Sequence, residues 1–259
     1  MRYTSDLAYS EWEFIDYCFP KPSGTGRPRK HSYRELFNAC AYVSKTGCQW
    51  RNLPKDFAPW RTAYHYFRLW KNNGLWEAMH TLLREVVRQT EGRKPQPSAA
   101  IIDSQSVKSS ETSDERGYDA GKKVNGRKRH ILVDTIGLLL TVLVLPANIQ
   151  DRDGAKQLLA AHFKQTPRRR VQHIWGDGGY AGTLVAWTRR MFRCTLEIVK
   201  RSDLHTFKVL PRRWVVERTF GWLGRYRRLS RDYERQAKTG ETMVQLAMIR
   251  LMLARLGKL

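Results

Sequence analysis

The chain is organised around residues 212–229, which read Arg212-Arg213-Trp214-Val215-Val216-Glu217-Arg218-Thr219-Phe220-Gly221-Trp222-Leu223-Gly224-Arg225-Tyr226-Arg227-Arg228-Leu229. The stretch follows a proline, a residue that is common where helices start. At helical spacing, Val216, Phe220 and Leu223 fall on one apolar face. The pattern therefore predicts an amphipathic helix late in the chain.

A second face of this helix carries Arg213, Glu217, Gly221 and Gly224 at spacings of three and four. Each glycine inside a helix costs about 1 kcal/mol relative to alanine. Packing alone does not favour that choice, so the bare face indicates that a large ligand approaches Glu217 closely. The alternative is an ordinary amphipathic helix with an Arg/Glu pair.

The overall charge points to a polyanionic partner. The 259 residues include 47 Lys and Arg against 24 Asp and Glu, which gives a net charge of +23. Nucleic acid fits better than an anionic membrane, and no apolar run reaches the roughly 18 residues that span a bilayer. The basic residues form clusters at 27–30, 122–130, 164–170, 189–193, 200–213 and 225–235.

The start of the chain has no apolar signal segment, and the four cysteines show no metal-type spacing. We expect reduced, structural cysteines and a cytoplasmic protein.

Residues 1–92 are predicted to form a small all-helical DNA-binding domain, which resembles a helix-turn-helix module. Before its second helix lies Gly26-Arg27-Pro28-Arg29, a flat basic segment that suits an A·T-rich minor groove or is simply a solvated linker. A Pro-rich linker at 93–98 follows. The predicted helices cover 6–17, 32–45, 59–72 and 74–90.

After the linker the pattern changes to alternating strands and helices, so residues 99–259 are predicted to form an α/β domain with a mixed sheet and flanking helices. Residues 108–127 are polar and Gly-rich and are predicted to be a mobile loop. The predicted strands are 99–107, 129–135, 138–145, 171–176 and 194–200. The predicted helices are 151–163, 181–193, the helix that carries Glu217, and 239–257.

Three carboxylates stand out in this basic chain: Asp103 inside an apolar strand, Asp177 at a strand end and Glu217 on its helix. Buried carboxylates are costly unless they are paired or bind metal. Each alone fits a structural capping role, but the three together fit Mg²⁺ or Mn²⁺, which prefer oxygen ligands. Two such ions about 4 Å apart can drive an in-line phosphoryl displacement.

The sequence resembles the DDE-type transposases of bacterial insertion sequences, in the insertion-sequence-five group, which have a ribonuclease H-like catalytic core. The resemblance covers almost the whole chain. It rests on Gly26-Arg27-Pro28-Arg29, Thr46-Gly47-Cys48-Gln49-Trp50-Arg51-Asn52-Leu53-Pro54, Tyr66-Phe67-Arg68-Leu69-Trp70, Ile102-Asp103-Ser104-Gln105-Ser106-Val107-Lys108, Gly126-Arg127-Lys128-Arg129-His130-Ile131-Leu132-Val133-Asp134, Asp177-Gly178-Gly179-Tyr180, Trp214-Val215-Val216-Glu217-Arg218-Thr219-Phe220 and Arg227-Arg228-Leu229-Ser230-Arg231-Asp232-Tyr233-Glu234.

The resemblance implies that Asp103, Asp177 and Glu217 are the catalytic and metal-binding residues, and that they hold two Mg²⁺ or Mn²⁺ ions. Arg213 matches the arginine of the signature around the glutamate. The basic residue expected seven positions after Glu217 is absent, because position 224 is glycine, and Arg225 is the nearest substitute.

The implied activity is cleavage at the ends of an insertion sequence and transfer of the 3′-hydroxyls to target DNA. The implied partners are double-stranded DNA, both transposon ends and target, and further copies of the chain in a homodimer or larger synaptic complex at the nucleoid. No membrane partner is expected. The predicted DNA contacts are Arg27, Arg29, Lys122, Lys123, Arg127, Lys128, Arg213, Arg218 and Arg225.

Two other functions are compatible with the sequence. A metal-dependent nuclease that cuts without joining would use the same three carboxylates. A non-catalytic DNA-binding protein descended from a transposase would keep the charge but lose carboxylates, so the presence of all three counts against it.

Overall fold

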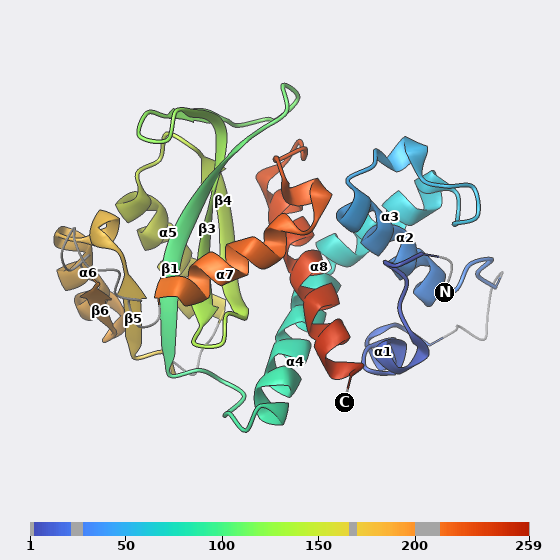
Figure 1. The fold of residues 1–259 in the computed structure, drawn as a ribbon, viewed down its shortest axis with the longest axis horizontal. Helices are drawn as coiled ribbons and strands as arrows, with labels where there is room; N and C mark the ends of the chain where they lie inside the picture. The colour runs from blue at the N-terminus through green and yellow to red at the C-terminus, as the bar shows by residue number, and fades with distance from the viewer. Residues whose placement is uncertain (1–2, 22–27, 166–169, 200–212, 259) are drawn as a thin grey trace. The chain divides into compact units, whose positions relative to one another are not determined.

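The computed structural model describes residues 3–21, 28–165, 170–199 and 213–258, with the side chain of residue 213 excepted (Figure 1). The chain forms two units. The first comprises Met1–Arg93, Gly224–Ser230 and Thr242–Leu259, and the second Lys94–Leu223 and Arg231–Glu241.

The first unit is helical. Its elements are α1 (Tyr9–Glu13), η1 (Asp16–Cys18), α2 (Tyr33–Thr46), η2 (Trp50–Asn52), α3 (Trp60–Asn72), α4 (Leu75–Thr90), η4 (Arg227–Leu229) and most of α8 (Ala237–Leu256). The predicted helices at 32–45, 59–72 and 74–90 agree with α2, α3 and α4 to within one residue. The helix predicted over 6–17 is much shorter, because the chain tightens into 3₁₀-type bonds after Trp12, where the amide of Ile15 donates to the Trp12 carbonyl.

Helix α2 shows why these boundaries are readable from sequence. The hydroxyl of Ser32 accepts from the amide of Glu35, and the Glu35 carboxylate accepts from the amide of Ser32, so the helix begins with a capping box. It ends at Gly47, whose φ of 73° is the left-handed conformation that glycine adopts without strain. Inside the unit, Phe37, Phe67 and Trp76 are buried and their rings are in contact, so these aromatic side chains form core.

The segments from the end of the chain also contribute to the first unit. Lys45 Nζ donates to the carbonyl of Arg225 at 3.1 Å, and Arg250 pairs with Glu11 at 3.2 Å. The second unit begins inside the predicted linker 93–98, but the grouping of 224–230 and 242–259 with the first unit differs from the predicted domain 99–259. Contacts between segments far apart in sequence cause this difference.

The second unit is built on a mixed sheet. Its strands in the described part of the chain are β1 (Ala99–Lys108), β2 (Gly117–Asp119), β3 (Val124–Asp134), β4 (Leu139–Pro146), β5 (His173–Gly176) and β6 (Thr195–Ile198). The order is β2-β3-β1-β5-β6, and β4 also pairs with β3. Pairing is antiparallel between β1, β3 and β4 and parallel between β1, β5 and β6.

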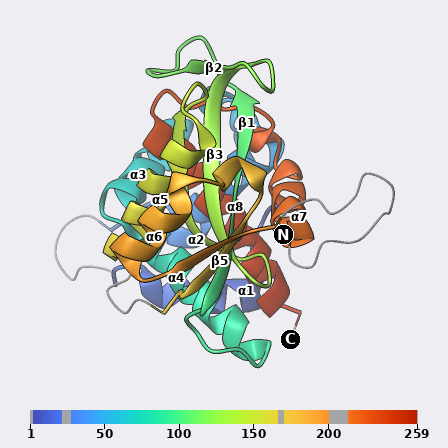
Figure 2. The ribbon, with the colours of Figure 1, turned by 90° about the vertical axis from the view of Figure 1, so that its left-hand side faces the viewer.

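Helices cover both faces of this sheet (Figures 1 and 2). On one face, α5 (Asp151–Gln165) and α6 (Thr183–Phe192) pack over a core that includes Ile102, Leu132 and Leu158. On the other face lies α7 (Arg213–Gly224), the helix predicted from the decisive stretch. The predicted fold class, a mixed α/β sheet with flanking helices preceded by a helical part, is confirmed.

The segment predicted as a mobile loop, 108–127, is partly ordered. Strand β2 pairs with the first residues of β3, so a hairpin with its turn at 120–123 replaces much of the loop. This prediction was wrong for its last residues because β3 begins at Val124, and Arg127 and the residues after it are buried in the sheet.

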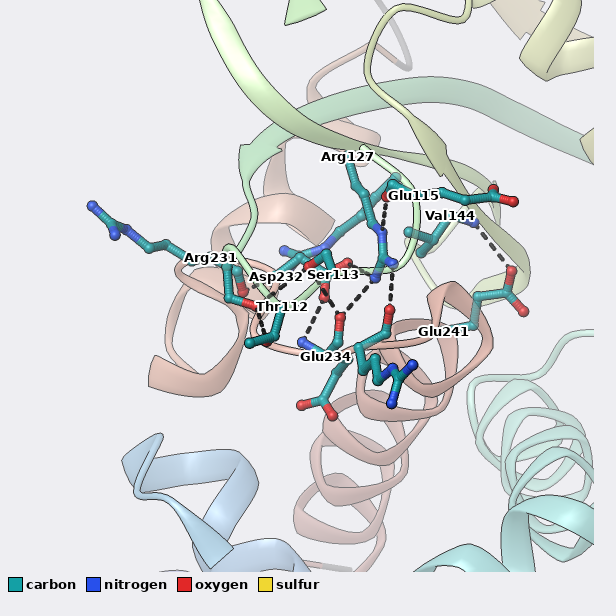
Figure 3. A network of polar contacts seen from close by, with 12 residues as sticks. Thr112, Ser113, Glu115, Arg127, Val144, Arg231, Asp232, Glu234 and Glu241 are labelled. Atoms are coloured by element: carbon teal, nitrogen blue, oxygen red, sulfur yellow. Dashed lines mark hydrogen bonds and ion pairs between the residues drawn. The ribbon is translucent and has the colours of Figure 1, made fainter. Parts of the chain in front are cut away.

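A network of polar contacts around Arg127 ties this region to residues 231–241 (Figure 3). The guanidinium donates to the carbonyls of Glu115 at 2.8 Å, Glu234 at 2.8 Å and Arg235 at 2.6 Å, and pairs with Asp232 at 3.5 Å. Both side chains of that pair are 1% exposed. Because a buried charge is costly without partners, this saturated guanidinium fixes the two segments against each other.

Helix α7 is anchored at the turn between β3 and β4. Arg218 Nη2 donates to the carbonyl of Ile136 at 2.9 Å, and Thr219 Oγ1 donates to that of Gly137 at 2.8 Å. Gly137 has a φ of 86°, and a Cβ placed there would lie 2.9 Å from both Thr219 Oγ1 and the Trp222 ring. The glycine is therefore required by its backbone conformation and by the close approach of α7.

Replacing Arg127 tests the buried network. Arg127→Met removes the cation that pairs with the buried Asp232, leaving the charge of Arg129 to act on that carboxylate, and deprives three carbonyls of their donor. We expect the free energy of unfolding, measured by urea denaturation, to fall by about 3–5 kcal/mol. Arg116→Met, an exposed cation on the same segment, is the control and should change it by less than about 0.5 kcal/mol. Equal losses in the two variants would show that the network does not stabilise the fold.

Replacing Gly137 tests the docking of α7. Gly137→Ala adds left-handed strain and a clash with Thr219 and Trp222, so we expect a loss of about 2–4 kcal/mol. Gly74 has a similar φ of 78° with no described atom within 4 Å of an added Cβ. Gly74→Ala should therefore lose only the strain, about 1–2 kcal/mol. Thermal unfolding followed by circular dichroism compares the two, and a smaller loss at Gly137 would contradict the contact.

Candidate functional site

Parallel strand pairing brings two of the predicted carboxylates to the same level. In the register of β1 and β5, Ile101 pairs with Trp175. Asp103 lies two residues further along β1, and Asp177 directly follows the end of β5, two residues after Trp175; both line the same pocket. Both are half-buried.

Local hydrogen bonds orient each carboxylate. The amide of Ser104 donates to Asp103 Oδ1 at 2.7 Å. The amide of Gly179 donates to Asp177 Oδ1 at 2.9 Å, so Asp177 caps the 3₁₀ turn η3 (Gly178–Tyr180) that follows β5.

One pocket joins these aspartates to α7. It is lined by Ile101, Ile102, Asp103, Trp175, Gly176, Asp177, Val199 and Val216. The lining residue from α7 is thus the neighbour of Glu217. The pocket holds two acids on mostly apolar walls, where charges interact more strongly than they do in water.

The third predicted carboxylate, Glu217, is exposed on α7. Among the described residues, no group of three or more His, Cys, Asp or Glu side chains is close enough to hold a metal ion. The structure therefore brings Asp103 and Asp177 together and leaves Glu217 outside a three-carboxylate cluster. The cause is the rotation of α7, which turns Val216 toward the pocket.

The bare face predicted next to Glu217 is open. No described atom lies within 4 Å of a Cβ placed at Gly221 or Gly224, and Trp214 on the same face is 45% exposed. Packing inside the described part of the chain does not require these glycines. The face leaves room for a ligand to approach the backbone of α7 beside Glu217.

Several predicted DNA contacts lie at the surface. Lys122 and Lys123 are exposed on the turn of the β2–β3 hairpin, and Arg225 is exposed after α7. Arg29 is exposed as well, with its guanidinium 3.4 Å from the centroid of the Tyr33 ring. Arg27 and the side chain of Arg213 lie outside the described residues.

Three other predicted DNA contacts are engaged inside the second unit. Arg127 is 1% exposed, and its guanidinium donates hydrogen bonds to the backbone carbonyls of the network in Figure 3. Lys128 is 5% exposed, and its Nζ lies 2.9 Å from the Ile149 carbonyl and 3.1 Å from Asp151. Both belong to β3 and not to a mobile loop, so neither can reach DNA in this fold.

The Arg218 side chain is also held by contacts within the second unit. Its guanidinium lies 4.3 Å from the ring centroid of Trp214 and 4.8 Å from that of Trp222, and it donates to the Ile136 carbonyl. Stacking and the hydrogen bond hold it against the sheet, which does not support the predicted phosphate contact.

Sequence reasoning missed one acid near the site, Asp151 at the start of α5. Burial alone would raise its pKa, but the Ser104 hydroxyl and the Lys128 ammonium outweigh burial and lower the pKa. The sequence feature that could have identified Asp151 is an acid between an apolar strand and a helix, a position similar to that of Asp177.

The hydroxyl of Tyr180 is buried near these acids and remains protonated. Its side chain is 1% exposed, and burial followed by the negative charges of Asp103, Asp151 and Asp177 raises its pKa well above the ordinary value. The hydroxyl therefore keeps its proton at neutral pH and can only donate or accept a hydrogen bond.

His130 gives the second unit a pH dependence. Burial lowers the pKa of His130 to about 4; Asp151 opposes this shift, and Lys128 and Lys122 add to it. The unfolded chain therefore binds the proton first as the pH falls from about 6.5 to 4, so acidification through that window lowers stability. At pH 4.5 the loss attributable to His130 is about 2 kcal/mol.

His130→Phe removes that proton while keeping a ring of similar shape. Neither ring nitrogen of His130 has a hydrogen-bond partner among the described residues, so the variant breaks no hydrogen bond there. Any packing cost of the larger ring against Gly154 is the same at both pH values. We expect the stability of the variant relative to the parent, measured by chemical denaturation, to rise by about 2 kcal/mol between pH 7.5 and pH 4.5. A difference that does not change with pH would contradict the assignment.

The described helices are all too short or too polar to cross a bilayer.

Comparison with known proteins identifies the family. The family model described as "Transposase DDE domain" matches residues 94–252, and the model "Putative transposase of IS4/5 family" matches residues 7–80. Two relatives are from Burkholderia cepacia. The first, "Putative transposase for insertion sequence element IS402", is 32% identical over 117 residues, 43% of this chain and 56% of its own length. The second, "Insertion element IS402 uncharacterized 16.2 kDa protein", is 28% identical over 123 residues, 44% of this chain and 74% of its own length.

Solved structures give a weaker likeness. The Mos1 mariner paired end complex with Mn is 10% identical, with a TM-score of 0.26 over 96% of this chain and 83% of that one. The Mos1 strand transfer complex is 12% identical, with a TM-score of 0.24 over 93% and 82%. The match to the first curated relative spans only about half of that protein's length. The family model, in contrast, covers more than half of this chain, including both aspartates and α7, and the chain therefore belongs to the family of DDE-domain transposases.

Proposed function

We propose that this chain cuts DNA at the ends of an insertion sequence and joins the freed 3′-hydroxyls to target DNA. The observation that carries the proposal is the parallel pairing of β1 with β5, because Asp103 and Asp177 follow the paired residues and line one pocket together with Val216 of α7. Family membership supports the reaction class, and the net charge of +23 supports a polyanionic substrate.

The residues fit a divalent cation by their chemistry. Asp103 and Asp177 present hard oxygen ligands, which suit Mg²⁺ or Mn²⁺, and their like charges in one pocket call for a cation. When bound, two such ions would activate a water or a hydroxyl and stabilise the leaving oxygen. Asp103 is proposed to serve both ions, and Asp177 and Glu217 one each.

Glu217 must move to join the pair. It is the neighbour of Val216, which lines the pocket, and successive helical residues are about 100° apart, so α7 would have to rearrange to bring the Glu217 carboxylate there. We propose that Glu217 enters when DNA and cations are present, because without them three like charges repel one another. The open backbone at Gly221 and Gly224 would let the DNA come close.

The rest of the chain supplies DNA binding. The cations proposed to contact phosphates are those that remain at the surface: Arg29, Lys122, Lys123 and Arg225. The helices of the first unit are proposed to recognise the terminal inverted repeats. Two ends must be cut together, so we propose a homodimer or a larger synaptic complex on DNA, acting in the cytoplasm at the nucleoid.

Carboxamide variants test the acids. Asp103→Asn and Asp177→Asn should each reduce cleavage of a duplex that carries the DNA flanking the gene by more than about a hundredfold, because a ligand charge is lost. DNA binding, measured by anisotropy, should persist with strong salt dependence. Glu111→Gln, at an exposed position of the same unit, is the control.

The outcomes separate the candidate functions. Unchanged cleavage in Asp103→Asn would remove the metal site and leave a cationic DNA-binding protein. If the variants lose cleavage but the parent gives no strand-transfer product from a pre-cut end, the protein is a nuclease that does not join. Full activity of Glu217→Gln would show that the third ligand has been assigned wrongly.

A further inference from the structure

Asp151 contacts both segments that carry the paired aspartates. Its Oδ1 accepts from the Ser104 hydroxyl at 2.7 Å, and Ser104 follows Asp103 on β1. Its Oδ2 lies 3.7 Å from where a Cβ on Gly179 would stand, and Asp177 Oδ1 lies 3.1 Å from the same point. Asp151 therefore sits at the junction of strand β1 and the turn that Asp177 caps.

A buried ammonium group holds Asp151 in this place. Lys128 Nζ lies 3.1 Å from Asp151 Oδ1, 3.4 Å from Asp119 Oδ2 and 2.9 Å from the carbonyl of Ile149. The Lys128 side chain is 6% exposed, so its hydrogen bonds to carboxylates are charge-assisted and shielded from water. The carboxylate of Asp151 is thereby fixed in direction.

The fixed carboxylate in turn fixes Asp103. Asp151 holds the side chain of Ser104, and the backbone amide of Ser104 donates to Asp103 Oδ1 at 2.7 Å. Tyr180 is also buried next to Ser104. Its side chain is 1% exposed, and its hydroxyl interacts with Ser104.

We infer that Asp151 is a positioning residue for the acidic site, which holds Asp103 through Ser104 and braces the turn that orients Asp177. The inference rests on the proposed function and adds a residue to it. Residues behind metal ligands usually change metal affinity or activity by 10- to 100-fold when they are altered. A residue that only starts helix α5 would affect stability and leave the response to metal unchanged.

The experiment uses the full-length protein and the variant Asp151→Asn, which keeps the shape but removes the charge. Two midpoints are measured: the Mn²⁺ concentration that half-maximally raises the melting temperature, and the Mg²⁺ concentration that half-maximally supports DNA cleavage. Both should rise at least about tenfold. The matched control is Asp153→Asn, an exposed acid in the same first turn that pairs with Lys156, and its midpoints should equal those of the parent.

A second variant tests the route and guards against misfolding. Ser104→Ala removes the hydroxyl that Asp151 holds. It should therefore raise the same two midpoints, and the double variant should shift them by less than the product of the single effects. If Asp151→Asn lowers only the melting temperature, or if Ser104→Ala leaves both midpoints unchanged, the inference is wrong. A parent protein that neither responds to Mn²⁺ nor cuts DNA would overturn the proposed function itself.

Discussion

Parallel pairing of β1 with β5 is the constraint on which the site depends. The two strands are far apart in sequence, and only their register determines that Asp103 and Asp177 stand at the same level. A shift of one residue would turn one of the aspartates to the opposite face of the sheet. Helices α5 and α6 cover one face with a continuous apolar core, which holds that register, because slipping would expose residues such as Ile102 and Ile174.

Buried basic side chains of β3 also stabilise the fold. Arg127, Lys128 and Arg129 follow one another in β3, and all three are buried. Successive residues of a strand alternate between faces, so Arg127 and Arg129 bond to segment 231–235, whereas Lys128 points to the α5 side and meets Asp151. Part of the positive charge of the chain therefore stabilises the fold and is not offered to DNA.

The sequence predicted most of the elements because their signals are local. Apolar runs bounded by turns gave the central strands, and the spacing of Val216 and Leu223 gave α7. The features that the sequence could not predict depend on contacts with residues far away in the chain. A basic run such as 127–129 is usually solvated, and its burial follows from carbonyls about a hundred residues away. The same holds for the grouping of 242–259 with the first unit and for Asp151, which matters only because β1 passes beside α5.

The position of Glu217 follows from how α7 is held. Arg218 and Thr219 bind the carbonyls of the β3–β4 turn, and this fixes the rotation that turns Val216 inward and Glu217 outward. Such contacts are worth about 1–3 kcal/mol each, whereas the attraction between a carboxylate and a divalent cation that partly escapes water is several times larger. In the proposed function, the helix is therefore anchored firmly enough to keep three like charges apart and weakly enough for cations and DNA to draw the third one in. The bare backbone at Gly221 and Gly224 lies on the side from which that DNA would have to come.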